Sequence, residues 1–210
     1  MRKTILFNYY NFLLKDIYNR SLKQNGFTPM GVCWRDRKSQ YIRFKILTDL
    51  LKRFSDNEKM KIADIGCGYA ELLSYFIEMK KKYLYEGYDI NRKMINFCNE
   101  RFNDFKFHIN DYPKNFCNVS VISGTYNYAV TQDIESWEQY LLYNLSRCYL
   151  NSNLGLVLNL QFKKKRIIRN NIYYTEISYM LSLLKRKFTR VEKYYSFNSS
   201  NDIYFIIYKN

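Results

Sequence analysis

The stretch Ile62-Ala63-Asp64-Ile65-Gly66-Cys67-Gly68-Tyr69-Ala70-Glu71 joins a short apolar strand to an amphipathic helix. Two glycines one residue apart let the backbone turn tightly and approach a ligand closely, and the first turn of the helix offers unpaired N–H groups. Such a turn is typical of the first strand and helix of an open parallel sheet, in which ligands bind beyond the carboxyl ends of the strands. We therefore expect a binding site at Gly66, Cys67 and Gly68.

The charge beside these glycines indicates what kind of ligand the turn binds. A dinucleotide-binding turn has the pattern G-x-G-x-x-G or G-x-G-x-x-A, but here the third small residue, Ala70, comes one position early. Asp64 lies two residues before the first glycine, where a carboxylate would repel a pyrophosphate and attract a cation. S-adenosylmethionine carries a sulfonium and an α-ammonium group, so the acid favours this ligand over a dinucleotide.

Strands and helices alternate along the rest of the chain with short connections. Strands are predicted at 61–64, 83–89, 105–109, 119–123, 154–162, 191–195 and 203–208, and helices at 38–54, 70–80, 91–102, 133–148 and 175–187. This order predicts a Rossmann-like α/β fold, with a doubly wound, mostly parallel seven-stranded sheet and an antiparallel C-terminal strand. The last two strands are expected to form a hairpin around 198–202.

The N-terminal residues are predicted to be helical and to cover the site. Residues 1–30 show an aromatic-rich amphipathic helix followed by a loop at 26–31, and the helix at 38–54 comes next. We expect residues 1–55 to form a helical lid and substrate region within the same domain, and residues 56–210 to form the core. Asn91 and Asp133 are predicted helix N-caps.

Polar residues follow the next three strands as well. Asp89 ends the second strand, Asp111 follows the third, and Ser123 ends the fourth. Together with Asp64 and the glycine turn, these residues resemble the motifs of class I S-adenosylmethionine-dependent methyltransferases. The family has a third glycine where this chain has Ala70, which is a departure from its pattern.

The resemblance implies S-adenosylmethionine as cofactor, S-adenosylhomocysteine as product, and a role for each motif residue. It implies that Asp89 binds the ribose hydroxyls, that Met94 packs on the adenine, and that Asp111 and Tyr112 contact the adenine edge. Arg43 is expected to reach the methionine carboxylate. The full set of cofactor-binding residues is Arg43, Asp64, Gly66, Cys67, Gly68, Asp89, Ile90, Met94, Asp111, Tyr112 and Ser123.

The segment 31–44, upstream of the glycine turn, resembles a bacterial subgroup of these enzymes with a Gly, Trp and Ser-Gln pattern. The resemblance is informative for the fold and the cofactor, and much less so for the substrate. Candidate substrate-binding residues are Trp34, Arg35, Tyr126, Asn127, Asn159 and Tyr173. Each of them has an alternative role as a core or loop residue, and the sequence leaves this choice open.

The implied reaction is in-line transfer of a methyl group to a nitrogen or oxygen atom, with carbon as the alternative, and positioning supplies most of the rate. No residue is assigned as a general base. His108 and Tyr112 are the nearest candidates, with a structural role as the alternative for His108, the single histidine. A small metabolite is the leading substrate, because no RNA-binding domain is appended and no Asn/Asp-Pro-Pro-Tyr/Phe motif follows the fourth strand. RNA, protein, or a non-catalytic role as a partner subunit are the alternatives.

The chain is strongly basic, with 34 Lys and Arg against 19 Asp and Glu, a net charge of +15. Attraction to an acidic partner such as nucleic acid is one explanation. The other is compositional, because Lys, Asn, Tyr, Phe and Ile share A/T-rich codons and all five are abundant. A nucleic-acid partner is therefore possible but not favoured, and the sequence does not decide the oligomeric state.

Cysteine usage and hydropathy indicate the cellular compartment in which the protein is expected. The five cysteines form no C-x-x-C pair and no cluster with histidine, which argues against a metal site and for a reducing compartment. No apolar run reaches the roughly 18 residues that a membrane span needs. We expect a cytoplasmic protein without metal or membrane span.

Overall fold

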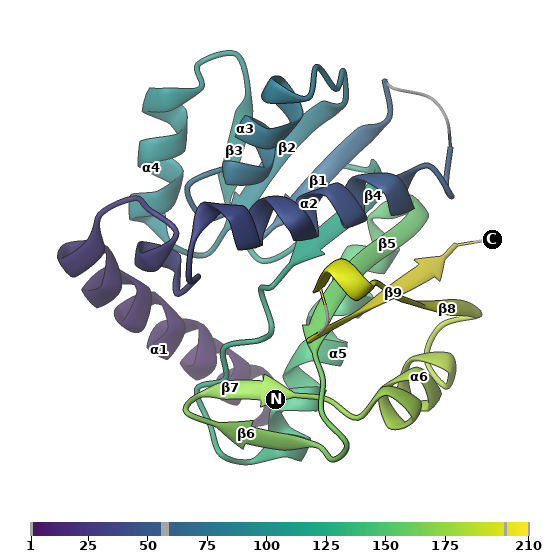
Figure 1. Cartoon of the computed structure of the whole chain (residues 1–210). Coiled ribbons are helices and arrows are strands. Elements are labelled where there is room, and N and C mark those ends of the chain that lie inside the picture. The colour runs from purple at the N-terminus through teal and green to yellow at the C-terminus, as the bar shows by residue number, and fades with distance from the viewer. Residues whose placement is uncertain (1, 56–58, 200, 210) are drawn as a thin grey trace.

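The computed structural model describes residues 2–55, 59–199 and 201–209 and contains a seven-stranded sheet in the order β3-β2-β1-β4-β5-β9-β8 (Figure 1). The first five strands by sequence run parallel, whereas β9 runs antiparallel to β5 and to β8. The strands are β1 (Lys61–Ile65), β2 (Leu84–Asp89), β3 (Lys106–Ile109), β4 (Cys117–Ser123), β5 (Ser152–Gln161), β8 (Arg190–Tyr195) and β9 (Asp202–Tyr208). The predicted Rossmann-like sheet, its reversed last strand and its final hairpin are thereby confirmed.

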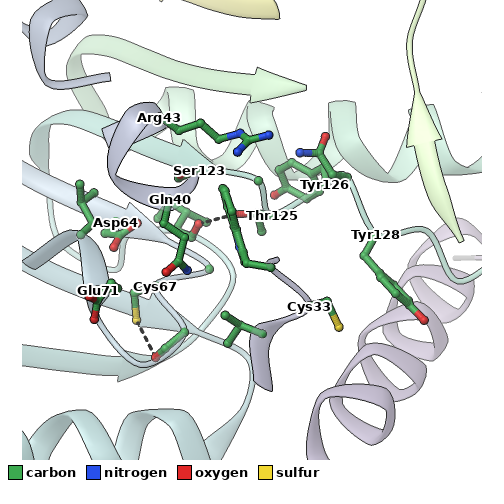
Figure 2. A pocket seen from close by; sticks show the side chains of 18 of the residues that line it. Cys33, Gln40, Arg43, Asp64, Cys67, Glu71, Ser123, Thr125, Tyr126 and Tyr128 are labelled. Carbon is green, nitrogen blue, oxygen red and sulfur yellow. Dashed lines mark hydrogen bonds between the residues drawn. The ribbon is translucent and has the colours of Figure 1, made fainter. Parts of the chain in front are cut away.

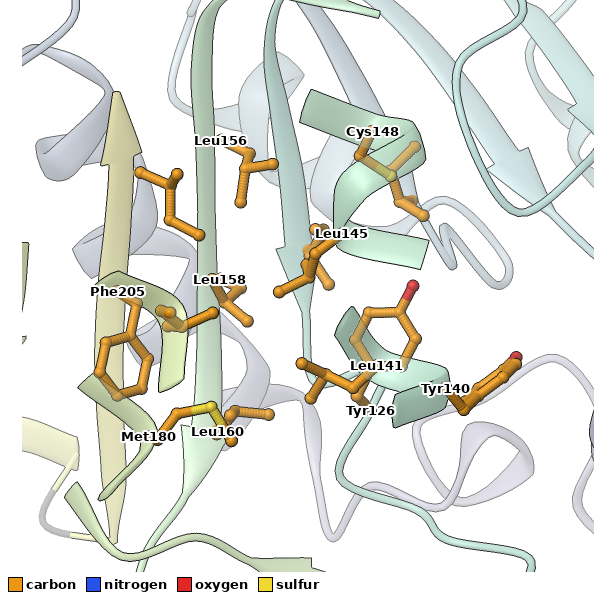
Figure 3. Close-up of a cluster of buried hydrophobic side chains, with 14 of the residues drawn as sticks. Tyr126, Tyr140, Leu141, Leu145, Cys148, Leu156, Leu158, Leu160, Met180 and Phe205 are labelled. Carbon is orange, nitrogen blue, oxygen red and sulfur yellow. The ribbon is translucent and has the colours of Figure 1, made fainter. Parts of the chain in front are cut away.

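Helices cover both faces of the sheet, because alternate strand residues are apolar on each side. Ile62 and Val121 pack with helices α2 (Arg37–Leu51), α3 (Glu71–Glu78) and α4 (Arg92–Arg101). Ala63 and Leu158 pack on the opposite face with α5 (Ile134–Leu150), α6 (Ile177–Lys185) and part of α1 (Arg2–Asn25). Figure 3 shows the second cluster, in which side chains of α5 and α6 meet those of β5 and β9.

Side-chain caps fix where four of the helices begin. The predicted caps are confirmed, since Asn91 accepts a hydrogen bond from the Lys93 N–H at the start of α4 and Asp133 does the same for Ser136 at the start of α5. Asp36 caps α2 and Glu176 caps α6 in the same way. Each cap satisfies N–H groups that the helix itself leaves unpaired.

The N-terminal segment differs in detail from its prediction. Helix α1 ends at Asn25, because Gly26 adopts φ +65° and its N–H closes the last turn on the Leu22 carbonyl. A short 3-10 helix, η1 (Met30–Val32), then leads to α2. Leu47 and Leu51 of α2 are completely buried, so α2 is part of a helix layer on the sheet, whereas most of the buried residues of α1 pack against α5 on the opposite face (Figure 1).

A two-stranded hairpin that the sequence did not predict lies beside the loop after β4. It consists of β6 (Ile167–Arg169) and β7 (Ile172–Tyr174), joined by Asn170 and Asn171, which both have positive φ. Asparagine tolerates this conformation, which two-residue hairpin turns need. The Tyr173 N–H donates to the Asn127 carbonyl, so the hairpin is attached to the loop after β4. A second 3-10 helix, η2 (Phe197–Ser199), precedes β9.

Candidate functional site

A cavity of about 520 Å³ opens at the carboxyl ends of β1 and β4. These neighbouring strands mark the point where the strand order reverses, which is where open α/β sheets bind ligands. Figure 2 shows residues of the glycine turn on one side of the cavity and Tyr126 and Tyr128 on the other. The sequence-predicted residues that line it are Trp34, Arg35, Arg43, Asp64, Gly66, Cys67, Gly68, Asp89, Ile90, Met94, Asp111, Ser123, Tyr126 and Asn127.

The glycine turn is held from two sides and has no room for a side chain at Gly66. The N–H groups of Gly66 and Cys67 both donate to the Tyr88 carbonyl, at 2.7 and 3.0 Å. Gly66 has φ +73°, and a Cβ atom there would lie 2.6 Å from Thr125 Oγ1. The Thr125 hydroxyl donates to the Ile65 carbonyl at 2.7 Å, which fixes it against the turn.

Ala70, the departure from the family's third glycine, adopts a conformation that glycine would adopt more easily. Its φ and ψ are 62° and 41°, in the left-handed region, and it is completely buried. A left-handed alanine costs about 1–2 kcal/mol. The turn therefore keeps the backbone path of a glycine although the side chain is a methyl group.

Two carboxylates, the buried Asp64 and the half-buried Asp89, line the cavity at the ends of β1 and β2. Asp64 accepts a hydrogen bond from the Tyr85 hydroxyl at 2.7 Å, and burial raises the pKa of its carboxyl to about 7. Asp89 accepts from the N–H groups of Gly68 and Asn91, at 3.0 and 2.8 Å, and burial raises its pKa as well. Neither acid has a basic partner within the described ranges, so both favour a cationic or hydroxyl-bearing ligand.

The other acids that line the cavity are neutralised by arginines. Glu71 accepts from Arg37 Nε at 2.6 Å, and Asp111 pairs with Arg147 at 3.0 Å. Asp111 also accepts from Asn11 of α1 at 3.2 Å, so its carboxylate is occupied before any adenine binds.

Arg43 reaches the cavity as predicted but is already paired. Its guanidinium lies 2.8 Å from Asp202 Oδ2, donates to the Ser39 carbonyl at 3.0 Å, and covers the Trp34 ring at 4.8 Å. Asp202 is completely buried and comes from the start of β9. This pairing counts against the predicted contact of Arg43 with a carboxylate ligand, because its charge is balanced within the protein.

Ser123 contributes an unsatisfied hydroxyl group. Its Oγ atom is buried and has no hydrogen-bond partner in the described part of the chain, yet the residue lines the cavity at the end of β4. Leaving a buried hydroxyl unpaired is costly. The atom is therefore a candidate contact for a bound ligand.

Four predicted site residues lie outside the cavity. The His108 ring stacks on Tyr88 near the sheet edge, and burial lowers its pKa. The Tyr112 ring lies under Arg147, and the completely buried Tyr173 donates to Glu138 at 2.7 Å. The fourth residue, Asn159, lies on β5 beside Ser123 of β4. The cavity lining therefore gives no support to the predicted roles of His108 and Tyr112 as bases, of Tyr112 at the adenine, or of Asn159 and Tyr173 in substrate binding.

Asn159 does not line the cavity, but its hydrogen bonds position residues that do. Its Oδ1 atom accepts from the Gly124 N–H at 2.9 Å, and its Nδ2 atom donates to Asp202 Oδ1 at 3.1 Å. Through these two bonds β5 connects the end of β4 to the ion pair between Asp202 and Arg43.

The cavity also contains residues that the sequence analysis did not propose for the site. Most of them come from elements distant in sequence from the glycine turn, and they include Tyr18, Cys33, Thr125, Tyr128, Tyr140, Gln161, Ile172, Asn198 and Asp202. Thr125 had a local signal, because it directly follows the predicted strand end at Ser123 and Gly124.

Neither a metal cluster nor a membrane span occurs within 2–55, 59–199 and 201–209. No cluster of three or more His, Cys, Asp or Glu side chains in these ranges is arranged to hold a metal ion. None of the helices in the same ranges combines the length and apolar character of a membrane span.

Comparison with solved structures identifies the fold. Magnesium protoporphyrin IX methyltransferase (ChlM) of Synechocystis PCC 6803, with S-adenosylhomocysteine bound, superposes with a TM-score of 0.60 at 14% identity, over 99% of this chain and 100% of that one. A Leishmania major S-adenosylmethionine-dependent methyltransferase gives 0.62 at 11% identity, covering 91% and 82%. Human N-acetylserotonin methyltransferase gives 0.56 at 11% identity, covering 96% and 67%.

At these identities the likeness establishes the fold, which is that of the S-adenosylmethionine-dependent methyltransferases. No family model matches the sequence. No curated protein matches it either.

Proposed function

We propose that this chain, which has a methyltransferase fold, is an S-adenosylmethionine-dependent methyltransferase that acts on a nitrogen or oxygen atom of a small molecule. One observation carries the proposal. Two carboxylates without a basic partner in the described ranges, the buried Asp64 and the half-buried Asp89, flank the glycine turn at the switch point of the sheet. A dinucleotide would bring a pyrophosphate to the glycine turn, where the carboxylate of Asp64 would repel it.

The residues present fit the cofactor. Asp64 would face its positive groups, and Asp89 would accept hydrogen bonds from the ribose hydroxyls. Ile90 and the buried side chain of Met94 would cover the adenine, and the unpaired Ser123 hydroxyl would find a partner near the methionine end. When bound, the cofactor supplies a methyl group on a sulfonium leaving group.

The protein itself positions the methyl acceptor and excludes water from the cavity. The loop residue Trp34 and the residue Tyr126 form walls on either side of the place where the fourth strand ends. We propose that α1 and η1, with the adjoining Cys33, act as the lid over the acceptor, since Leu14, Tyr18 and Cys33 all line the same cavity. Enclosure by these elements favours a small acceptor over a polymer.

The names of two similar structures support this choice, because ChlM and human N-acetylserotonin methyltransferase are named for small-molecule substrates. The net charge of +15 is the observation that favours RNA as a second candidate. Binding to RNA through charge alone would fall steeply as salt rises. Nanomolar RNA affinity that persists at physiological salt would favour this second candidate.

Calorimetry with S-adenosylmethionine, S-adenosylhomocysteine and NAD tests the proposal. We expect the first two to bind and to raise the melting temperature, since ligand at about 100 times its dissociation constant adds about 2.7 kcal/mol to stability. NAD is expected to do neither. A shift with NAD alone would disprove the assignment. Binding without turnover on a metabolite panel would instead indicate a non-catalytic partner subunit.

A further inference from the structure

The end of the cavity away from the glycine turn is lined mainly by aromatic rings. We call this the acceptor end, and define it by Tyr18, Trp34, Tyr126, Tyr128, Tyr140 and Ile172. Figure 2 shows Tyr126 and Tyr128 across the cavity from Asp64, Cys67 and Glu71. The rings of Tyr18 and Tyr128 lie 6.2 Å apart, so α1 and the loop after β4 form one aromatic wall.

Charged groups at the acceptor end are neutralised within the protein. The carboxylate of Asp202 accepts hydrogen bonds from Arg43, Asn159 and Ser199. Because Arg43 is in an ion pair with Asp202, its positive charge is balanced within the protein. Arg35 is mostly exposed, with 84% of its side chain accessible, and it pairs with Asp36 at 2.7 Å. A carboxylate substrate would therefore find no free guanidinium among the described residues that line this end.

No described residue at the acceptor end is suited to remove a proton from a substrate. Burial raises the pKa of the Tyr18, Tyr126 and Tyr140 hydroxyls above the ordinary value, so these phenols stay protonated. His108 lies outside the cavity, and Asp202 is held in its ion pair. An alcohol acceptor needs a general base within hydrogen-bond reach, and the described residues of this end do not supply one.

We infer that the methyl acceptor is a neutral amine on an aromatic or other apolar body, an inference that rests on the proposed function. The amine lone pair forms the new N–C bond, while the C–S bond of the cofactor breaks and its electron pair returns to sulfur. The resulting ammonium later gives its proton to water. Positive charge thus moves from sulfur to nitrogen, and the faces of aromatic rings stabilise cations. Once the amine has lost its own proton to water, methyl transfer to it requires neither a general base nor a free guanidinium.

Three sets of matched probes test the inference on the full chain saturated with S-adenosylhomocysteine. Benzylamine, 2-phenylethylamine and 3-phenylpropylamine are each compared with the alcohol and the carboxylate of the same carbon skeleton. We expect at least one amine to raise the melting temperature of the complex, and to accept a methyl group from S-adenosylmethionine at least tenfold faster than its alcohol and carboxylate counterparts. Mass spectrometry of the product identifies the methylated atom.

Two variants test whether the acceptor end is the part of the cavity that binds the amine. Tyr128→Leu is expected to weaken amine binding at least fivefold while leaving the affinity for S-adenosylhomocysteine unchanged. Phe116→Leu is the matched control, because Phe116 is exposed and does not line the cavity. It is expected to change neither quantity.

The outcomes separate this inference from the function on which it rests. If the wild-type protein does not bind S-adenosylhomocysteine, the proposed function is overturned. The amine inference alone would be overturned if the protein binds S-adenosylhomocysteine but prefers an alcohol or a carboxylate probe. The same holds if it binds S-adenosylhomocysteine but none of the amines. Equal effects of Tyr128→Leu and Phe116→Leu would overturn the assignment of the acceptor end.

Discussion

The indole ring of Trp34 lies so close to Gly124 that a Cβ atom on residue 124 would come within 2.7 Å of indole Cζ2. Gly124 also has φ +73°, and its N–H is held by Asn159 at 2.9 Å. Arg43 covers the same ring at 4.8 Å. The loop before α2 is thus attached to the end of β4 through one aromatic side chain, at the edge of the cavity.

Gly124→Ala is expected to displace Trp34 and to destabilise the fold. The left-handed backbone costs an alanine about 1–2 kcal/mol, and overpacking adds about 1–3 kcal/mol. Gly26→Ala is the matched control, because Gly26 also has positive φ but no atom lies within 4 Å of the place that a Cβ would occupy there. In denaturant unfolding, Gly26→Ala should lower the free energy of unfolding only by the cost of the left-handed backbone.

The double variant Trp34→Ala with Gly124→Ala separates the two causes. If the ring causes the overpacking, removing it should make the effect of Gly124→Ala as small as that of Gly26→Ala. Equal costs for Gly124→Ala in the presence and absence of the indole would contradict the contact.

The sequence predicted the parts of the site that arise from local pattern. Asp64, the glycine turn and Asp89 occupy strand ends, and parallel strands bring their carboxyl ends to one edge of a sheet. Apolar alternation and cap residues located most of the strands and helices. The hairpin of β6 and β7 escaped prediction because strands of three residues are too short to show alternation.

The remaining site residues depend on packing between distant segments. Arg43 was predicted on a helix, but its partner Asp202 comes from the last strand, and nothing in either segment indicates the other. Tyr18 reaches the cavity only because α1 lies against the loop that carries Tyr128. Tyr173 was predicted as a cavity wall, but its hairpin turns its hydroxyl towards Glu138.

Cofactor affinity is expected to rise with pH through about 7 because of Asp64. In the free protein burial raises the pKa of this carboxyl to about 7, so below that pH it is largely protonated. A cationic ligand favours the charged form, and binding at lower pH must first release the proton. Calorimetry from about pH 5.5 to 8.5 should show the affinity rising and then levelling above pH 7, and Asp64→Asn should remove the dependence.

The same shift affects the stability of the ligand-free protein in the opposite direction. The folded-state pKa lies above the unfolded value of about 3.9, so stability falls as pH rises from about 4 to 7. Asp64→Asn should therefore melt at a higher temperature than the wild type at pH 8 and show less advantage at pH 5. Asp16→Asn serves as an exposed control. A lower melting temperature for Asp64→Asn at pH 8 would contradict the burial cost.

Asp89→Ala is expected to weaken cofactor binding at least roughly tenfold. Hydrogen bonds to a charged group contribute about 1.5–3 kcal/mol each, and tenfold in affinity corresponds to about 1.4 kcal/mol. Asp89→Asn keeps the shape and one acceptor oxygen, so its affinity should lie between those of Asp89→Ala and the wild type. Trp34→Ala should retain cofactor affinity and lower turnover. Wild-type affinity in Asp89→Ala would mean that the ribose is bound elsewhere.

Ala70 offers a test of why this chain tolerates alanine where the family has glycine. Ala70→Gly relieves the left-handed strain of about 1–2 kcal/mol, but it removes a buried methyl group worth about 0.8 kcal/mol and gives the unfolded chain about 0.4–1 kcal/mol more entropy. These effects nearly cancel, so we expect stability within about 1 kcal/mol of the wild type. Ala70→Val adds a branched side chain to a left-handed residue in a filled core and should cost more than about 2 kcal/mol. Denaturant unfolding of the two variants checks both values, and a valine variant as stable as the wild type would mean that residue 70 is not left-handed in solution.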